Sequence, residues 1–211
     1  MKYYFQPDPS RREVRLGRFV ADAVTEDGVV EVQTRSLEKL RPKLAAFLPQ
    51  GPVTVVYPVA AEKTVIWVNS AGECTRPRKS PLKPTAGYVL PELYRIRDFL
   101  TCDGLRLCLL MLKVEDYRLL DGWSRDGKRG STRFDRMPVA LLDQVWLCSP
   151  GDYAQLVPAK LPEVFTSREL GKAIGRTPKK ASLAANVLRG LGVIRQEGKL
   201  GSAYLYTRGS F

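Results

Sequence analysis

The sequence contains no histidine, and this absence excludes several common kinds of catalytic site. Catalytic triads with a histidine base, and zinc sites built on histidine ligands, cannot form. Its four cysteines form no C-x-x-C pair, so we expect reduced thiols in the core rather than a metal site. Any hydrolytic chemistry must therefore use carboxylates with a metal ion, or another base.

Long apolar runs and phosphate-binding glycine loops are also missing. No hydrophobic stretch reaches the ~20 residues that a membrane-spanning helix needs, and residues 1–13 lack the apolar core of a signal peptide. Neither G-x-G-x-x-G nor G-x-x-x-x-G-K-[ST] follows a predicted strand, so we expect no nucleotide or organic cofactor. These absences predict a soluble cytoplasmic protein with no membrane partner.

Acidic residues are fewer than basic ones, with 22 Asp and Glu against 34 Lys and Arg and a net charge of +12. Residues 158–211 hold ten basic and three acidic residues, a net charge of +7. A further basic cluster, in GWSRDGKRGST, contains Arg125, Lys128 and Arg129. This balance predicts a polyanionic partner, DNA above all, although each cluster alone is also compatible with a solvated loop.

The hydrophobic pattern of residues 1–157 predicts strand, strand, helix, strand, hairpin, helix and strand in chain order. This order is typical of an α/β or α+β layered sheet. The helix predicted over residues 36–49 contains Pro42, which should kink or shorten it. The apolar run VTVVYPV, bounded by Pro52 and Pro58, predicts a buried strand.

The stretch FVADAVTEDGVVEVQTRS predicts a hairpin with polar residues in both arms. TEDG has turn chemistry, and Gly28 can adopt a positive φ. Because side chains alternate along a strand, Glu31 and Gln33 share one face, and pairing of the arms can bring Asp22 near Glu31. Two neighbouring carboxylates favour a hard cation between them, unless they simply face solvent on an ordinary hairpin.

This pattern resembles the PD-(D/E)XK nuclease superfamily, whose fold is restriction-endonuclease-like. The resemblance implies a mixed sheet flanked by helices over residues 1–157. It also implies that Asp22 and Glu31 are metal ligands for a magnesium or manganese ion. Gln33 stands where the family has lysine, and the resemblance implies that it orients water or a phosphate oxygen.

Two departures from the family pattern accompany this resemblance. Residue 21 is alanine where the motif has proline, and only KYYFQPDPS precedes the first strand where the family has a helix that often carries a glutamate. Glu13 is the candidate for that acid; the alternative is that the helix is missing from this chain. The implied activity is hydrolysis of DNA phosphodiesters by a metal-dependent deoxyribonuclease, although Gln33 cannot supply the positive charge of a lysine.

Residues 158–211 resemble a winged helix-turn-helix domain. Thr166 or Ser167 should cap a first helix, and Thr177 with Pro178 should begin a second one, followed by two strands around EGKLG. The second helix of such a domain enters the major groove, and the wing meets the DNA backbone. The predicted DNA-binding residues of this domain are Lys179, Lys180, Ser182, Asn186, Arg189, Arg195 and Lys199.

Three functional hypotheses follow from these patterns. The first is a metal-dependent DNA endonuclease with a winged-helix DNA-binding module. The second is a non-catalytic DNA-binding regulator whose degenerate nuclease-like domain serves packing or dimerisation. If that domain dimerises, the protein is a homodimer. The third is an adaptor that uses both domains for protein contacts, as some winged helices do.

Overall fold

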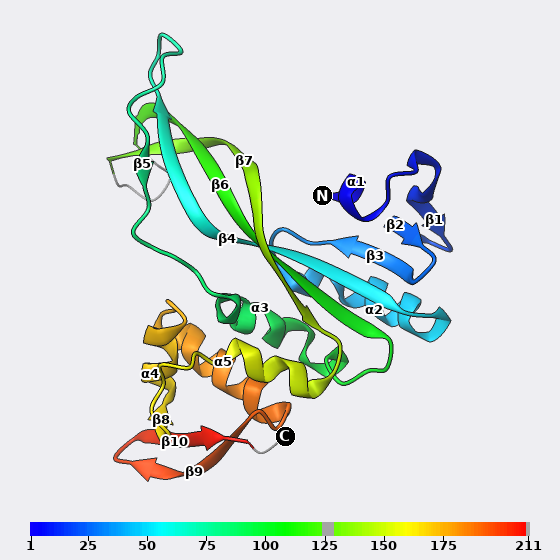
Figure 1. The fold of residues 1–211 in the computed structure, drawn as a ribbon, viewed down its shortest axis with the longest axis vertical. Coiled ribbons are helices and arrows are strands. Elements are labelled where there is room, and N and C mark those ends of the chain that lie inside the picture. The colour runs from blue at the N-terminus through cyan, green and yellow to red at the C-terminus, as the bar shows by residue number, and fades with distance from the viewer. Residues whose placement is uncertain (124–128, 210–211) are drawn as a thin grey trace.

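The computed structural model describes residues 1–123 and 129–209, and it contains a large mixed sheet flanked by helices (Figure 1). Its strand order is β1-β2-β3-β4-β6-β7, with β5 paired to β4. Arg125 and Lys128 lie outside the described residues. The strands are β1 (Arg12–Leu16), β2 (Phe19–Thr25), β3 (Gly28–Val32), β4 (Val53–Val68), β5 (Arg78–Lys79), β6 (Leu105–Trp123) and β7 (Arg129–Leu147).

The sheet combines antiparallel and parallel pairings. β1, β2 and β3 form an antiparallel meander, β3 and β6 each run parallel to β4, and β7 returns antiparallel to β6. Parallel neighbours need a crossover connection, and helical segments supply both crossovers here. The predicted mixed α/β architecture is therefore present.

Short helical segments make these connections. Between β3 and β4 lie η2 (Leu37–Leu40), α2 (Arg41–Phe47) and η3 (Leu48–Gln50), and Pro42 falls in the first turn of α2. Proline is tolerated there because its missing N–H would have no intrahelical partner, so the predicted shortening is confirmed. The second crossover, from β4 to β6, contains η4 (Ala86–Val89), α3 (Leu90–Leu93) and η5 (Tyr94–Phe99). Of the remaining segments, α1 (Lys2–Phe5) and η1 (Pro9–Arg11) precede β1, and η6 (Pro150–Leu156) follows β7.

The prediction that Pro58 ends a strand is wrong, because β4 continues through it to Val68. β3 ends at Val32, opposite Val56, so Pro58 lies where that edge of β4 has lost its neighbour. A strand edge tolerates a residue that cannot donate a hydrogen bond. Together with the 19 residues each of β6 and β7, this long β4 builds a ribbon that projects from the helices (Figure 1).

Two hydrophobic clusters occupy opposite faces of the sheet. The larger one joins the sheet to α2, α3 and the C-terminal segments, and it includes Leu107 and Leu188. The smaller one contains Cys108 and Val114. Of the four cysteines only Cys108 is buried, so the prediction of core thiols is wrong for Cys74, Cys102 and Cys148, which are exposed.

The C-terminal segments form a second, three-stranded sheet with two helices. β10 (Ala203–Arg208) lies between β8 (Phe165–Thr166) and β9 (Ile194–Leu200). The helices α4 (Ser167–Ala173) and α5 (Pro178–Gly190) connect β8 to β9. The Thr166 cap is confirmed: its side chain accepts from the Glu169 N–H, and Glu169 accepts from the Thr166 N–H. The hairpin turn lies at Gly201, the last residue of EGKLG, and β9 includes the four residues before it.

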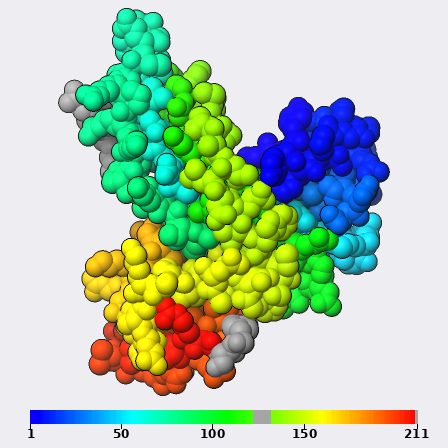
Figure 2. Space-filling view, viewed as in Figure 1, coloured from blue at the N-terminus to red at the C-terminus, as the bar shows by residue number. Residues whose placement is uncertain are grey.

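This C-terminal module packs against the helices of the main sheet rather than standing apart. α5 lies against α3, and Lys180 Nζ is 3.9 Å from a carboxylate oxygen of Glu92. The Arg176 guanidinium stacks over the ring of Tyr88 and donates two hydrogen bonds to its carbonyl oxygen. In the space-filling view, the ribbon end and the N-terminal segment form two separate projections above this compact base (Figure 2).

No helix within residues 1–123 and 129–209 is long and apolar enough to cross a membrane.

Candidate functional site

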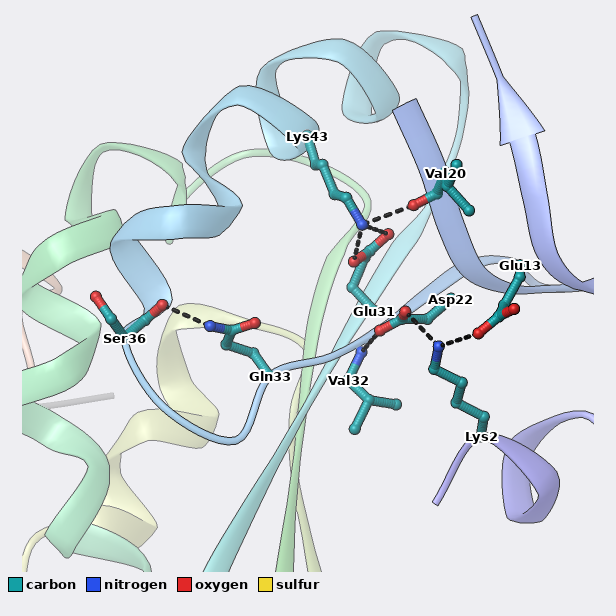
Figure 3. Close-up of polar contacts among 9 residues, drawn as sticks. All are labelled: Lys2, Glu13, Val20, Asp22, Glu31, Val32, Gln33, Ser36 and Lys43. Atoms are coloured by element: carbon teal, nitrogen blue, oxygen red, sulfur yellow. Dashed lines mark hydrogen bonds and ion pairs between the residues drawn. The ribbon is translucent and has the colours of Figure 1, made fainter. Parts of the chain in front are cut away.

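The β2–β3 hairpin brings Asp22 and Glu31 onto adjacent strands (Figure 3). Ala23 pairs with Val30 in this antiparallel hairpin. Asp22 directly precedes Ala23 and Glu31 directly follows Val30, so the two acids occupy neighbouring positions on the two strands. Asp22 Oδ2 accepts a hydrogen bond from the Val32 N–H at 2.8 Å. The side chain of Asp22 thus reaches across to the strand that carries Glu31.

Glu31 is buried, with 1% of its surface exposed, and it is held by a lysine from α2. Lys43 Nζ donates to both carboxylate oxygens of Glu31, at 3.0 and 2.8 Å, and to the carbonyl oxygen of Val20 at 2.7 Å. Burial raises the pKa of Glu31, and the hydrogen bond and charge of Lys43 only partly oppose that rise. A buried carboxylate is thus tolerated here because an ammonium group faces it.

Lys43 was not among the site residues predicted from the sequence, although a signal for it was present. Lys43 directly precedes the buried Leu44 in the helix that follows the hairpin, so it lies at the border of the apolar face. A helix that packs across β3 therefore points one long basic side chain at the single acid buried beneath it. Apolar periodicity identifies the packed face, but it does not show which polar residue at its margin meets a buried charge.

Glu13 meets the acid pair only through Lys2. Lys2 Nζ lies 3.0 Å from a carboxylate oxygen of Glu13 and 3.0 Å from Asp22 Oδ1. The hydrogen bond with Asp22 is the main cause of the raised pKa of Lys2. Glu13 lies in β1, its side chain is 71% exposed, and it is preceded by two short segments, the four-residue α1 and the three-residue η1.

Gln33 points away from the two carboxylates. Its Nε2 donates to the carbonyl oxygen of Ser36 at 2.7 Å (Figure 3). Its backbone N–H donates to the carbonyl oxygen of Val56 in β4. The side chain therefore fixes the loop that leads into η2. In this arrangement the Gln33 amide contacts neither Asp22 nor Glu31.

The protein itself engages all four carboxylate oxygens of Asp22 and Glu31. Two carboxylates suit a hard divalent ion, but Lys2 and Lys43 supply the positive charge here. Among the described residues, no three His, Cys, Asp or Glu side chains are close enough together to hold a metal ion. A magnesium or manganese ion bound by both acids would have to displace at least one ammonium group, and its presence stays a prediction.

The second candidate surface is one face of α5. Lys179, Ser182, Asn186 and Arg189 are exposed, and their spacing of three, four and three residues places them on a single side of the helix. The buried residues Ala181, Ala184, Ala185, Val187 and Leu188 form the other side. Lys180 is half-buried beside Glu92, so it belongs to the packed side of α5.

β9 carries the predicted wing residues beside this helix. Arg195 and Lys199 are both exposed, and Lys199 Nζ lies 4.7 Å from the centre of the Tyr204 ring on β10. Arg189 donates to the Gln196 side chain at 3.3 Å, which ties the end of α5 to the same strand. Of the basic cluster in GWSRDGKRGST, only Arg129 lies in the described chain, as the first residue of β7.

Comparisons with known proteins find one family and a bacterial relative. Residues 1–148 match a family model described as Domain of unknown function (DUF8091). The chain is 31% identical over 209 residues to an "Uncharacterized protein" of Treponema pallidum (strain Nichols), which covers 99% of this chain and 82% of that protein. No solved structure matches the chain.

Proposed function

The chain belongs to the DUF8091 domain family through residues 1–148, and we propose that this member binds duplex DNA through α5 and the β9–β10 hairpin. The observation that carries the proposal is the exposed face of Lys179, Ser182, Asn186 and Arg189. An α-helix fits the major groove, where asparagine, serine and arginine side chains can hydrogen-bond base edges.

The connectivity of the C-terminal module supports a winged helix-turn-helix. β8, α4, α5, β9 and β10 follow one another in chain order, and the strands form a sheet beside the two helices. In that fold the second helix reads the groove, and the hairpin contacts phosphates. Arg195 and Lys199 on β9 are the candidates for those contacts, and the net charge of +7 favours a polyanionic partner over a protein one.

For residues 1–157 we favour a nuclease-like domain that does not cut DNA. The mixed sheet, the acid pair at the β2–β3 hairpin and the following α2 support the PD-(D/E)XK resemblance. The ion pairs of Asp22 with Lys2 and of Glu31 with Lys43 support a structural use of these acids. The protein then acts as a DNA-binding regulator.

One observation favours metal-dependent cleavage as a second candidate function. Lys43 places an ammonium group against Glu31, and this supplies the positive charge that Gln33 cannot provide in place of a lysine. The test is incubation of linear, supercoiled, branched and single-stranded DNA with magnesium or manganese. Cutting by wild type that is lost in Glu31→Gln but kept in Glu26→Gln, which changes an exposed acid in the turn between β2 and β3, would support the nuclease. No cutting by wild type supports the regulator.

The DNA-binding proposal is tested by fluorescence anisotropy with labelled duplex DNA. Lys179→Gln removes one charge from the exposed face of α5, whereas Lys160→Gln removes the same charge from the exposed connector before β8. We expect the first variant to bind duplex more weakly and the second to match wild type. Equal affinity of all three proteins, or no binding by wild type, would overturn the assignment of this face.

A further inference from the structure

A second basic site lies on the ribbon, around a buried carboxylate. Asp116 of β6 has no exposed surface, and it lies on the same face as Val114, two residues before it. Three arginines surround it: Arg136 Nε at 2.9 Å, Arg133 Nε at 3.1 Å, and Arg118 with Nη2 at 3.0 Å. One buried acid thus orients three guanidinium groups.

Asp116 has more arginine partners than are needed to neutralise its charge within the β6–β7 pair. Arg136 is the cross-strand partner of Asp116, so a single pair would neutralise the buried acid. Arg118 and Arg133 are also cross-strand partners of each other, and like charges directly opposite one another destabilise a sheet. The extra positive charge therefore costs stability in the free protein, and an anion would offset that cost.

Two hollows adjoin the cluster, and both are lined by Arg133, Arg136 and Thr34. The first has a volume of about 440 Å³ and is also lined by Arg35 and the exposed ring of Phe134. The second has a volume of about 300 Å³ and is also lined by Lys63. Thr34 and Arg35 directly follow Gln33, so the hollows begin where the acid hairpin ends.

The charge around the hollows is predominantly positive. Four basic side chains line the hollows, those of Arg35, Lys63, Arg133 and Arg136, together with the carboxylate of Asp135. Arg118 and the buried Asp116 adjoin them through the ion pairs of the cluster. Burial lowers the pKa of Lys63; the charge of Asp116 opposes this shift, and the charges of the arginines add to it. A bound anion would remove the repulsion that this crowding creates.

We propose that this ribbon cluster binds a backbone phosphate of a nucleic-acid strand. Planar guanidinium groups match phosphate oxygens with two parallel hydrogen bonds, and here Asp116 holds them in place before the ligand arrives. Phe134, 69% exposed beside Arg133, offers an apolar ring to the adjoining sugar or base, which favours a strand over a free phosphate ion. The inference rests on the proposed DNA binding and adds a contact surface far along the chain from α5.

The test uses Lys63→Gln, because Lys63 lines the second hollow without a hydrogen bond to Asp116, and its loss leaves the three ion pairs in place. The control is Lys39→Gln, an exposed lysine of η2 away from both hollows. Anisotropy with the labelled duplex should show weaker binding only for Lys63→Gln. The salt dependence of its affinity, as log K against log salt, should be shallower by about 0.9, as for one lost phosphate contact.

Each outcome separates this inference from the α5 proposal. If wild type fails to bind duplex, both proposals fall. If Lys179→Gln weakens binding while Lys63→Gln matches Lys39→Gln, only the ribbon site is overturned. The second arm measures the shift in unfolding temperature that inorganic phosphate causes. If phosphate stabilises wild type but not Lys63→Gln, and the two proteins bind DNA equally well, the ligand of the site is a free phosphate and the proposed nucleic-acid strand is overturned.

Discussion

Glu31 shows how one buried carboxylate is accommodated within a sheet. It has almost no exposed surface, and Lys43 of α2 contacts both of its oxygens. Burial nevertheless raises the pKa of Glu31 above its ordinary value of 4.5. The ion pair therefore only partly compensates the desolvation of the charged form, and this imbalance can be measured.

The raised pKa of Glu31 predicts a specific pH dependence of stability. Because the folded state holds the proton more tightly, the contribution of Glu31 to the free energy of unfolding is fully present below about pH 4.5. It is lost as the pH rises through the raised pKa. Urea unfolding of wild type and Glu31→Gln across this window should show the wild-type excess falling with pH. An excess that stays constant or rises would contradict the account.

The polar residues of the hairpin could be predicted from the sequence, but their partners could not. Alternation along the strands identified Asp22 and Glu31 as neighbours, and the turn at Gly28, with φ of 114°, was predictable from TEDG. Lys2 and Lys43 come from other elements, so their contacts depend on how α1 and α2 pack. Strand periodicity carries no information about that packing.

At the scale of elements, the pairing of β6 with β7 in the ribbon is stabilised by the buried carboxylate of Asp116. Burial raises the pKa of this acid, but the hydrogen bond and charge of Arg136, with those of Arg118 and Arg133, outweigh burial and lower it overall. The carboxylate is therefore charged in the folded protein at neutral pH. Its removal would leave three arginines on adjacent strands without their shared acid.

Asp116→Asn should accordingly destabilise the protein by about 3 kcal/mol, near the low end for breaking a buried ion pair because the arginines are partly exposed. Chemical denaturation measures the change. Asp135→Asn, which alters an exposed acid on the neighbouring strand, serves as the control and should stay within about 0.5 kcal/mol of wild type. Similar losses for both variants would show that the buried acid has no special role.

The length of the ribbon was not predictable from local pattern. Pro58 is an ordinary strand terminator in a sequence, and only the end of β3 beside it makes the proline acceptable within β4. The starts of α4 and α5 were predictable, since Thr166 with Glu169 and Thr177 with Pro178 act within a few residues, although the Thr177 side chain makes no capping hydrogen bond. Features set by residues close in the sequence can thus be predicted, whereas features that depend on a neighbouring strand cannot.

At the scale of the whole molecule, one hydrophobic cluster continues from the main sheet into the C-terminal module. Leu93 and Ile96 of the first part and Leu188 and Ile194 of the second are all buried in it. The predicted domain boundary between residues 157 and 158 separates the two sets of elements, but their buried side chains belong to one hydrophobic cluster. We therefore expect the two parts to unfold together.

Tryptophan fluorescence can test this coupling, because all three tryptophans lie in residues 1–157. Ile194→Val trims a buried side chain of the C-terminal module and should cost about 0.5–1.5 kcal/mol. In a chain of this size, that lowers the unfolding midpoint by about 2–4 °C per kcal/mol. Ile96→Val makes the same change within the first part and should lower the midpoint similarly. A tryptophan midpoint unchanged by Ile194→Val would mean that the module unfolds independently.

The most direct test of DNA binding by this protein is the affinity of wild type for duplex DNA over a range of salt concentrations. Contacts between Lys or Arg and phosphates release counterions, so log K should fall linearly with log salt, by about 0.9 for each phosphate contacted. Lys179→Gln should bind more weakly with a shallower slope, and Lys160→Gln should follow wild type. Affinity that does not change with salt, or slopes that are equal in all three proteins, would contradict DNA recognition by the exposed face of α5.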